Sequence, residues 1–188
     1  MNRRDFLKHA LTAGAGLAAL TVGRPPGLLG AESRNSYDMT AVLGGGPVEM
    51  FDRGIAAIGG MTRYVKKGQT VMIKPNASWG VPPEQGATTT PALVGRVIEH
   101  CIEAGASKVY VLDHTIDSPG RAFSATGIEE AVKRSGGTIV PANSKGYYQE
   151  VEIRKARQLR KVMAHEQLFE ADVFINIPIL KHHGSTRI

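Results

Sequence analysis

Polar side chains that could bind a ligand or transfer a proton follow three expected strands, each at the point where its strand ends. Ligands of open parallel sheets bind outside the carboxyl ends of the strands, which lie along one edge. We therefore expect ammonium, amide, carboxylate and imidazole groups from distant parts of the chain to converge on one site. These residues are Lys74 and Asn76 after 70–73, Asp113 and His114 after 108–112, and Lys181 and His183 after 172–177.

The residue types divide these side chains between two roles. Asp113 or His114 is expected to act as a proton donor or acceptor, because carboxyl and imidazole groups commonly do so in enzymes. The others are expected to bind an anionic or metal-bearing group, and the long loop 77–89 could lie over it. These binding residues are Lys74, Asn76, Lys181 and His183.

A metal ion is a second candidate ligand of this region. His182 and His183, together with His114 and a carboxylate, are the kind of ligands that hold borderline or hard metal ions. In the alternative interpretation, one of these His side chains faces solvent and another hydrogen-bonds the main chain. The sequence leaves both interpretations open.

Strand-like and helix-like segments alternate along the chain after a short polar stretch at 32–38. Apolar runs predict strands at 39–43, 70–73, 108–112, 138–140 and 172–177. The last run is nearly continuous in apolar residues, so we expect that strand to be buried on both faces. The alternation predicts an α/β layered fold with a mainly parallel, Rossmann-like sheet.

The helices between these strands have recognisable ends. One is expected at 48–58, before a Gly-Gly stop, and one from Thr90-Pro91 to near Gly105, with Thr90 as the N-cap. A third is expected from Ser124 as the N-cap to Arg134. A hairpin within 147–161 and a short helix at 164–170 precede the last strand.

Composition and charge indicate a globular chain and argue against nucleic-acid binding. Of the 188 residues, 42% are hydrophobic and 21% are charged. Residues 32–188 contain 19 basic and 16 acidic side chains, and a net charge of +3 is too mild for a protein that neutralises a phosphate backbone. The basic run 154–161 has no interleaved aromatic residues and is predicted to be a solvated face.

Two smaller signals are interpreted as structural. Cys101 is the only cysteine and lies between apolar neighbours in a helical pattern, so we expect it in the core. A single cysteine can form neither an intramolecular disulfide nor the set of thiolates that holds an iron–sulfur cluster. The glycines at 44–46 could cradle a phosphate, but Glu49 stands where the dinucleotide fingerprint needs a third glycine, so we expect a tight turn.

The first 31 residues resemble the twin-arginine (Tat) export signal of bacteria. Adjacent Arg3 and Arg4 are followed by Phe6, Leu7 and Lys8, and then by an apolar run at 10–22. This run is too short to cross a bilayer, which needs about 20 apolar residues. The resemblance implies the Tat translocase as a partner, export to the periplasm in folded form, and no transmembrane helix in the mature chain 32–188.

The rest of the chain is similar to a bacterial and archaeal family catalogued as domain of unknown function 362 (DUF362). The most specific matching stretches are Lys74-Pro75-Asn76 and the pattern that runs from Asn176 through Pro178 and Lys181 to His183. Further matching stretches lie at 58–61, 65–68, 86–91 and 103–106. The resemblance extends over roughly residues 40–188.

This resemblance implies an exported or iron–sulfur protein, because many members carry a ferredoxin-like segment beyond the domain. A cluster would need cysteines from beyond residue 188, since Cys101 is alone. The family's domain continues past His183, so we expect 32–188 to be truncated at its C-terminus. A last strand with an unpaired edge would then make the isolated segment prone to aggregate.

Two functions follow from these observations. The first is a redox or cofactor-dependent enzyme that is exported in folded form and possesses the site at the strand ends. The second is a non-catalytic periplasmic protein that holds a metal ion or an anion in the same pocket. The sequence identifies neither the cofactor nor the substrate.

Overall fold

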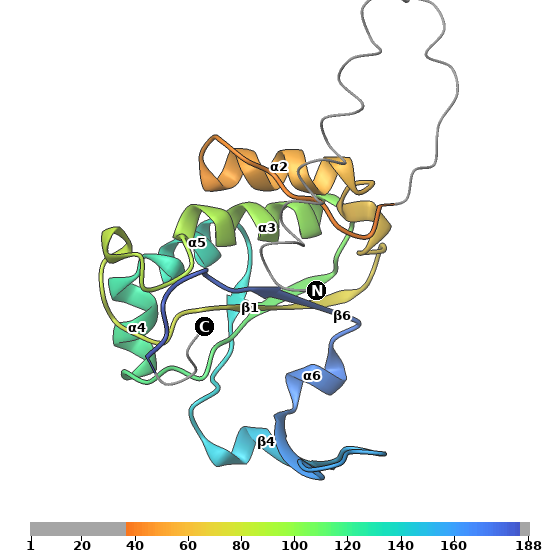
Figure 1. Ribbon diagram of the computed structural model, residues 1–188, viewed down its shortest axis with the longest axis vertical. Coiled ribbons are helices and arrows are strands. Elements are labelled where there is room, and N and C mark those ends of the chain that lie inside the picture. Colours follow the sequence, from red (N-terminus) through yellow and green to blue (C-terminus); the bar gives the residue numbers. More distant parts are fainter. Residues whose placement is uncertain (1–36, 185–188) are drawn as a thin grey trace, which may run out of the picture. The chain divides into compact units, whose positions relative to one another are not determined.

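The computed structural model describes residues 37–184, and the expected signal at 1–31 lies outside this part. At its centre is a parallel sheet with the strand order β3-β2-β1-β6 (Figure 1). Thr70 of β1 lies opposite Lys108 of β2, and Pro75 of β1 lies opposite Ile177 of β6. The strands are β1 (Thr70–Pro75), β2 (Lys108–Val111), β3 (Thr138–Ile139) and β6 (Val173–Ile177).

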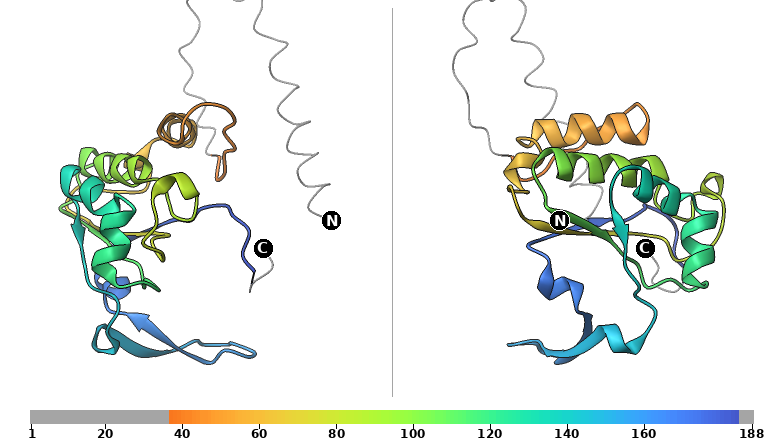
Figure 2. Two further views of the ribbon diagram at one scale, coloured as in Figure 1. Left: turned by 90° about the vertical axis from the view of Figure 1, so that its left-hand side faces the viewer. Right: turned by 180° about the vertical axis from the view of Figure 1, so that it is seen from behind.

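Helices α2 (Pro47–Ala57), α3 (Pro91–Glu103) and α5 (Ile128–Arg134) cover one face of this sheet (Figures 1 and 2). The layering confirms the predicted α/β fold with a mainly parallel sheet. Helix α3 begins at Thr90-Pro91 as predicted, although the Thr90 side chain forms no capping hydrogen bond, so the fixed φ of Pro91 is what favours this start. The apolar side of α3 packs with β1 in the core, through Val94, Val97, Ile98 and Cys101 against Val71 and Ile73.

An antiparallel hairpin and a short helix lie on the other side of the sheet from these helices (Figures 1 and 2). The hairpin consists of β4 (Tyr148–Glu152) and β5 (Lys161–His165), and α6 (Gln167–Glu170) leads from it into β6. The predicted hairpin is therefore confirmed. It is longer than expected, and the positions 164–165, predicted to be helical, belong to β5 because they pair with β4.

The predicted strand at 39–43 is wrong. These residues form no strand, because no neighbouring strand of the described chain is in position to pair with them. They lie instead against α2, where Gly54 permits a close approach. A Cβ atom at Gly54 would lie 3.3 Å from Cγ2 of Val42 and 3.5 Å from Cγ2 of Thr40.

The predicted helix from Ser124 to Arg134 is in fact two helices. Ser124 lies inside α4 (Pro119–Ala125) and is not an N-cap. Gly127, with a φ of 74°, interrupts the segment before α5, a conformation that favours glycine. The Thr126 hydroxyl satisfies the end of α4 by donating to the carbonyl of Ala122 at 2.8 Å.

The expectation that the last strand is buried on both faces is also wrong. Strand β6 lies at the edge of the sheet in the described chain, and its burial alternates along the strand. Phe174 is 49% exposed on the hairpin side, whereas Ile177 is buried. An apolar run is therefore compatible here with a strand that is covered on one face only.

Short 3-10 helices and loops complete the described chain. The 3-10 helices are η2 (Met61–Arg63), η3 (Pro83–Gln85) and η4 (Lys145–Tyr147). Within residues 37–184, no helix is long and apolar enough to span a membrane.

Candidate functional site

A nearly buried carboxylate joins the carboxyl ends of β1 and β2. Asp113 is 4% exposed, accepts a hydrogen bond from the main-chain N–H of Ala77 at 2.7 Å, and forms an ion pair with Nζ of Lys74 at 2.7 Å. The Lys74 side chain is 40% exposed, so its ammonium group also reaches a cavity. The structure thus brings Lys74 and Asp113 into contact, while the role of each in binding or catalysis stays a prediction.

The strand order reverses beside β1, because the chain leaves β1 toward β2 and β3 and returns with β6 on the other side. At this point Nζ of Lys181 donates hydrogen bonds to Oδ1 of Asn76, at 2.8 Å, and to the carbonyl of Ala87. Open α/β sheets bind ligands at such reversal points. Two more of the predicted binding residues, Asn76 and Lys181, are therefore in contact.

Thr89 connects the loop after β1 to the carboxyl ends of β1 and β6. Its hydroxyl accepts a hydrogen bond from the main-chain N–H of Asn76 at 2.9 Å and donates to the carbonyl of Ile177 at 2.7 Å. The loop ends at the N-terminus of α3, which carries a partial positive charge. Within the described chain, the neighbouring hydroxyl of Thr88 is buried without a hydrogen-bond partner.

The charge of Lys181 is not balanced by a carboxylate of the described chain. Both of its acceptors, on Asn76 and Ala87, are neutral oxygen atoms. An ammonium group has three N–H donors, and these two bonds use two of them. Because Lys181 is partly buried, water solvates the remaining positive charge incompletely. This arrangement favours an anion beside Lys181.

A hydrogen-bond chain at the end of β2 determines which nitrogen of His114 carries a proton. The Tyr148 hydroxyl donates its one proton to the carbonyl of Ala142 at 2.7 Å, and Nδ1 of His114 lies 3.0 Å from the same oxygen. The Tyr148 oxygen can therefore only accept from His114, so Nδ1 is the protonated nitrogen. In the neutral ring, Nε2 of His114 is then left with a lone pair that can take a proton or bind a ligand.

Tyr148 keeps its proton at ordinary pH. Burial, together with the negative charge of Asp113, raises the pKa of the Tyr148 phenol. The hydroxyl consequently continues to donate to Ala142, and the orientation of His114 is maintained. Sequence reasoning missed Tyr148 because it lies in a polar segment whose position on the sheet depends on long-range packing.

The predicted metal ligands His182 and His183 lie on the exposed segment that follows β6. In the part of the chain that the structure describes, no three His, Cys, Asp or Glu side chains are gathered so as to hold a metal ion. Their assignment as metal ligands, and that of His183 as an anion ligand, stay predictions.

Cys101 does not fit an iron–sulfur cluster. It is buried in α3, as expected for a core residue, and burial raises the pKa of its thiol to about 12. Metals bind the thiolate, which is disfavoured here, and the sequence supplies no second cysteine.

The remaining sequence signals are structural. The glycines at 44–46 form a turn before α2, in which the carboxylate of Glu49 lies against Gly45. The negative charge of this carboxylate would repel a phosphate bound at the turn. The basic run 154–161 is mostly exposed, and its Lys161 pairs with exposed Glu150 at 2.7 Å, as expected for a solvated face.

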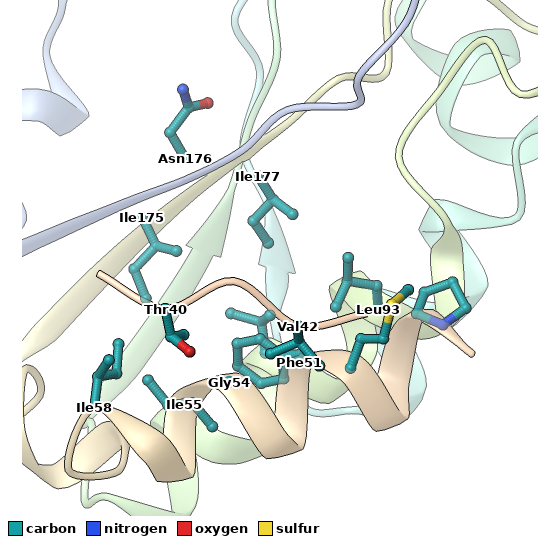
Figure 3. A pocket seen from close by; sticks show the side chains of 13 residues that line it. Thr40, Val42, Phe51, Gly54, Ile55, Ile58, Leu93, Ile175, Asn176 and Ile177 are labelled. Carbon is teal, nitrogen blue, oxygen red and sulfur yellow. The ribbon is translucent and has the colours of Figure 1, made fainter. Parts of the chain in front are cut away.

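Two cavities differ in chemical character. One, of about 500 Å³, lies between α2, the segment before it and β6, and no titratable side chain lines it. Figure 3 shows that Ile175 and Ile177 point toward α2, whereas Asn176 points away. The second, of about 370 Å³, lies between the sheet and the hairpin and is lined by Lys74, His114 and Tyr148 among apolar residues. Of these two cavities, the second adjoins the predicted site, because Lys74 and His114 line it.

Fold and site together define an α/β protein with polar residues gathered at the carboxyl ends of a parallel sheet. Residues 71–188 match the family model described as Domain of unknown function (DUF362), which is more than half of the chain. The chain therefore belongs to the DUF362 family. No curated protein and no solved structure matches it.

Proposed function

We propose that this protein is exported in folded form and binds a small anion, or the anionic group of a cofactor, at the carboxyl ends of β1, β2 and β6. The observation that carries the proposal is the ammonium group of Lys181. It is held by neutral oxygen atoms of Asn76 and Ala87 at the reversal of the strand order. An anion there would balance the charge of Lys181 and accept a hydrogen bond from its remaining N–H.

Proton transfer to or from the bound group is assigned to His114 rather than Asp113. The carboxylate of Asp113 is buried and engaged by Lys74 and by the N–H of Ala77. His114 is exposed, and its Nε2 atom is left with a lone pair in the neutral ring. With His114 as the acid or base, the first candidate function is that of a cofactor-dependent enzyme, and this class includes redox enzymes.

The anion site is tested by titrating the full chain with inorganic phosphate and with sulfate, using calorimetry. Lys181→Ala removes the charged donor, and we expect affinity to fall at least about tenfold, since a charged hydrogen bond contributes about 1.5–3 kcal/mol. Lys133→Ala is the matched control, because Lys133 is exposed on α5, away from the strand ends. Equal affinity of the Lys181→Ala variant and the wild type would refute the site.

A non-catalytic anion carrier is the second candidate, and the engagement of Asp113 favours it. Acid–base catalysis commonly needs a group that gives a proton and another that takes it. Lys74 and Asp113 neutralise one another, which leaves His114 as the better placed of the two predicted catalytic groups. The candidates are separated by following the anions that bind, by NMR, during incubation with the protein. Steady conversion of one of them excludes a mere carrier.

A further inference from the structure

The cavity between the sheet and the hairpin has an apolar part and a basic part. Its apolar part is lined by Phe174 of β6, Met163 of β5 and Leu168 of α6, all of which are between 42% and 58% exposed. Met72 and Leu112 form its floor on the sheet. In Figures 1 and 2 the hairpin lies on this side of the sheet, away from α2 and α3.

The basic part of the cavity lies around His114. Lys74 and His114 line the same cavity as the apolar side chains. An adjoining cavity of about 520 Å³ shares His114, Tyr148 and Met163 and adds Lys145. The one carboxylate of the described chain that pairs with Lys74 is Asp113, and it is buried behind the strand ends.

We propose that the substrate is an amphipathic acid, whose carboxylate faces Lys74 and His114 and whose apolar chain lies against Met163, Leu168 and Phe174. This inference goes beyond the proposed function and does not depend on it, because Lys181, which carries the proposed anion site, is not among the residues that line this cavity or the adjoining one. Apolar walls with a few convergent polar groups are typical of small-molecule sites.

The polar groups select an acid over an alcohol or an amine. The ammonium of Lys74 and the Nε2 atom of His114, once protonated, both donate hydrogen bonds to an anion. An alcohol would gain the same apolar contacts without the charge. An amine would meet the like charge of Lys145 in the adjoining cavity, and that of the His114 ring once it is protonated.

The test is a calorimetric titration of the full chain with acetate, butanoate, hexanoate and octanoate, and with octanol as the uncharged comparison. We expect affinity to rise about three- to fourfold for each added methylene while the chain remains inside the cavity. Octanol should bind at least about tenfold more weakly than octanoate, because it lacks the charged hydrogen bonds. Equal binding of acetate and octanoate, or of octanol and octanoate, overturns the inference.

Two variants locate the apolar chain. Met163→Asp places a negative charge in the cavity wall at a half-exposed position, so folding should survive while the dependence on chain length is lost. Leu159→Asp is the control, because Leu159 is 62% exposed on the hairpin and does not line the cavity. If octanoate binds the Met163→Asp variant as tightly as the wild type, the site is wrong.

The outcomes also separate this inference from the proposed function. Phosphate binding that depends on Lys181, without any dependence on chain length among the acids, would leave the anion site standing and refute the amphipathic substrate. Failure of phosphate, sulfate and every acid to bind would refute both.

Discussion

At the scale of single residues, burial separates ion pairs that have the same geometry. Lys74 with Asp113 and Lys161 with Glu150 both have N–O distances of 2.7 Å. The Asp113 side chain is 4% exposed, whereas that of Glu150 is 57% exposed. Water therefore screens the second pair far more than the first, and the two should differ in their contribution to stability.

Asp113→Asn should lower the free energy of unfolding by about 2 kcal/mol, because it leaves the Lys74 ammonium without its charged partner. Glu150→Gln should change it by less than about 0.5 kcal/mol. Urea denaturation of both variants measures the difference. Equal effects of the two substitutions would mean that burial does not strengthen the Asp113 contacts.

Cys101 gives the folded protein a dependence on alkaline pH. Burial raises its thiol pKa from the ordinary value of 9.0 to about 12. The unfolded chain loses this proton first, so the contribution to stability is fully present below pH 9 and is lost as the pH rises from 9 to 12. The loss is about 1.4 kcal/mol per pH unit in this window.

Cys101→Ala removes this titration. We expect the wild type to lose about 1.4 kcal/mol relative to the variant between pH 8 and pH 10. Denaturant titrations of both proteins at pH 8 and pH 10 give their unfolding free energies. The contributions of titrating groups that the two proteins share cancel in the difference between them. A difference that does not change with pH would contradict the burial of an uncharged thiol.

At the scale of elements, Tyr148 and His165 hold the hairpin to the segment that follows β3. Tyr148 bonds the carbonyl of Ala142 and orients His114. His165, nearly buried at the end of β5, bonds the carbonyl of Pro141 at 3.0 Å and accepts from the N–H of Gln167. The hairpin therefore controls the geometry of His114, although it contributes no strand to the central sheet.

Tyr148→Phe should lower the free energy of unfolding by about 1 kcal/mol and release the fixed tautomer of His114. NMR of the imidazole nitrogens would then show both neutral tautomers in place of one. Tyr147→Phe is the control, because the Tyr147 ring stacks on His165, with centroids 5.9 Å apart, and does not contact His114 through a hydroxyl bond. Unchanged nitrogen shifts in the Tyr148→Phe variant would exclude this orienting role.

The sequence predicts the elements whose patterns are local and long. Helix α3 was recognisable from Thr90-Pro91 and the spacing of its apolar residues, and β1 and β2 from their apolar runs. The strand predicted at 39–43 has an equally apolar run, but pairing needs a partner strand that no local pattern reveals. The break at Gly127 was missed because an isolated glycine inside a helical pattern is often tolerated.

At the scale of the whole molecule, the rule for parallel strands predicted which distant residues meet. It predicted that these residues gather at one edge, and the structure there shows contacts of Lys74 with Asp113 and of Asn76 with Lys181. It could not anticipate Tyr148, because the hairpin crosses a face of the sheet and not its edge. Nor did it identify Thr89, whose hydroxyl acts through main-chain atoms.

Export of the whole protein is tested at the N-terminal arginines. Arg3→Lys together with Arg4→Lys should abolish export if the twin-arginine translocase reads this pair, because lysine lacks the planar guanidinium group. Fractionation of a bacterial host that expresses the chain would locate the protein. Arg24→Lys is the matched control in the same N-terminal segment, and export of the double variant at the wild-type level would refute the route.

The hydrogen bond between Lys181 and Asn76 joins residues that are 105 positions apart. During synthesis, β1, β2 and β3 are complete before the ribosome reaches Lys181, so the cation that carries the proposed site arrives after all three strands. The proposed anion site is incomplete until Lys181 reaches Asn76. A bound anion would therefore mark molecules in which β6 has already docked beside β1.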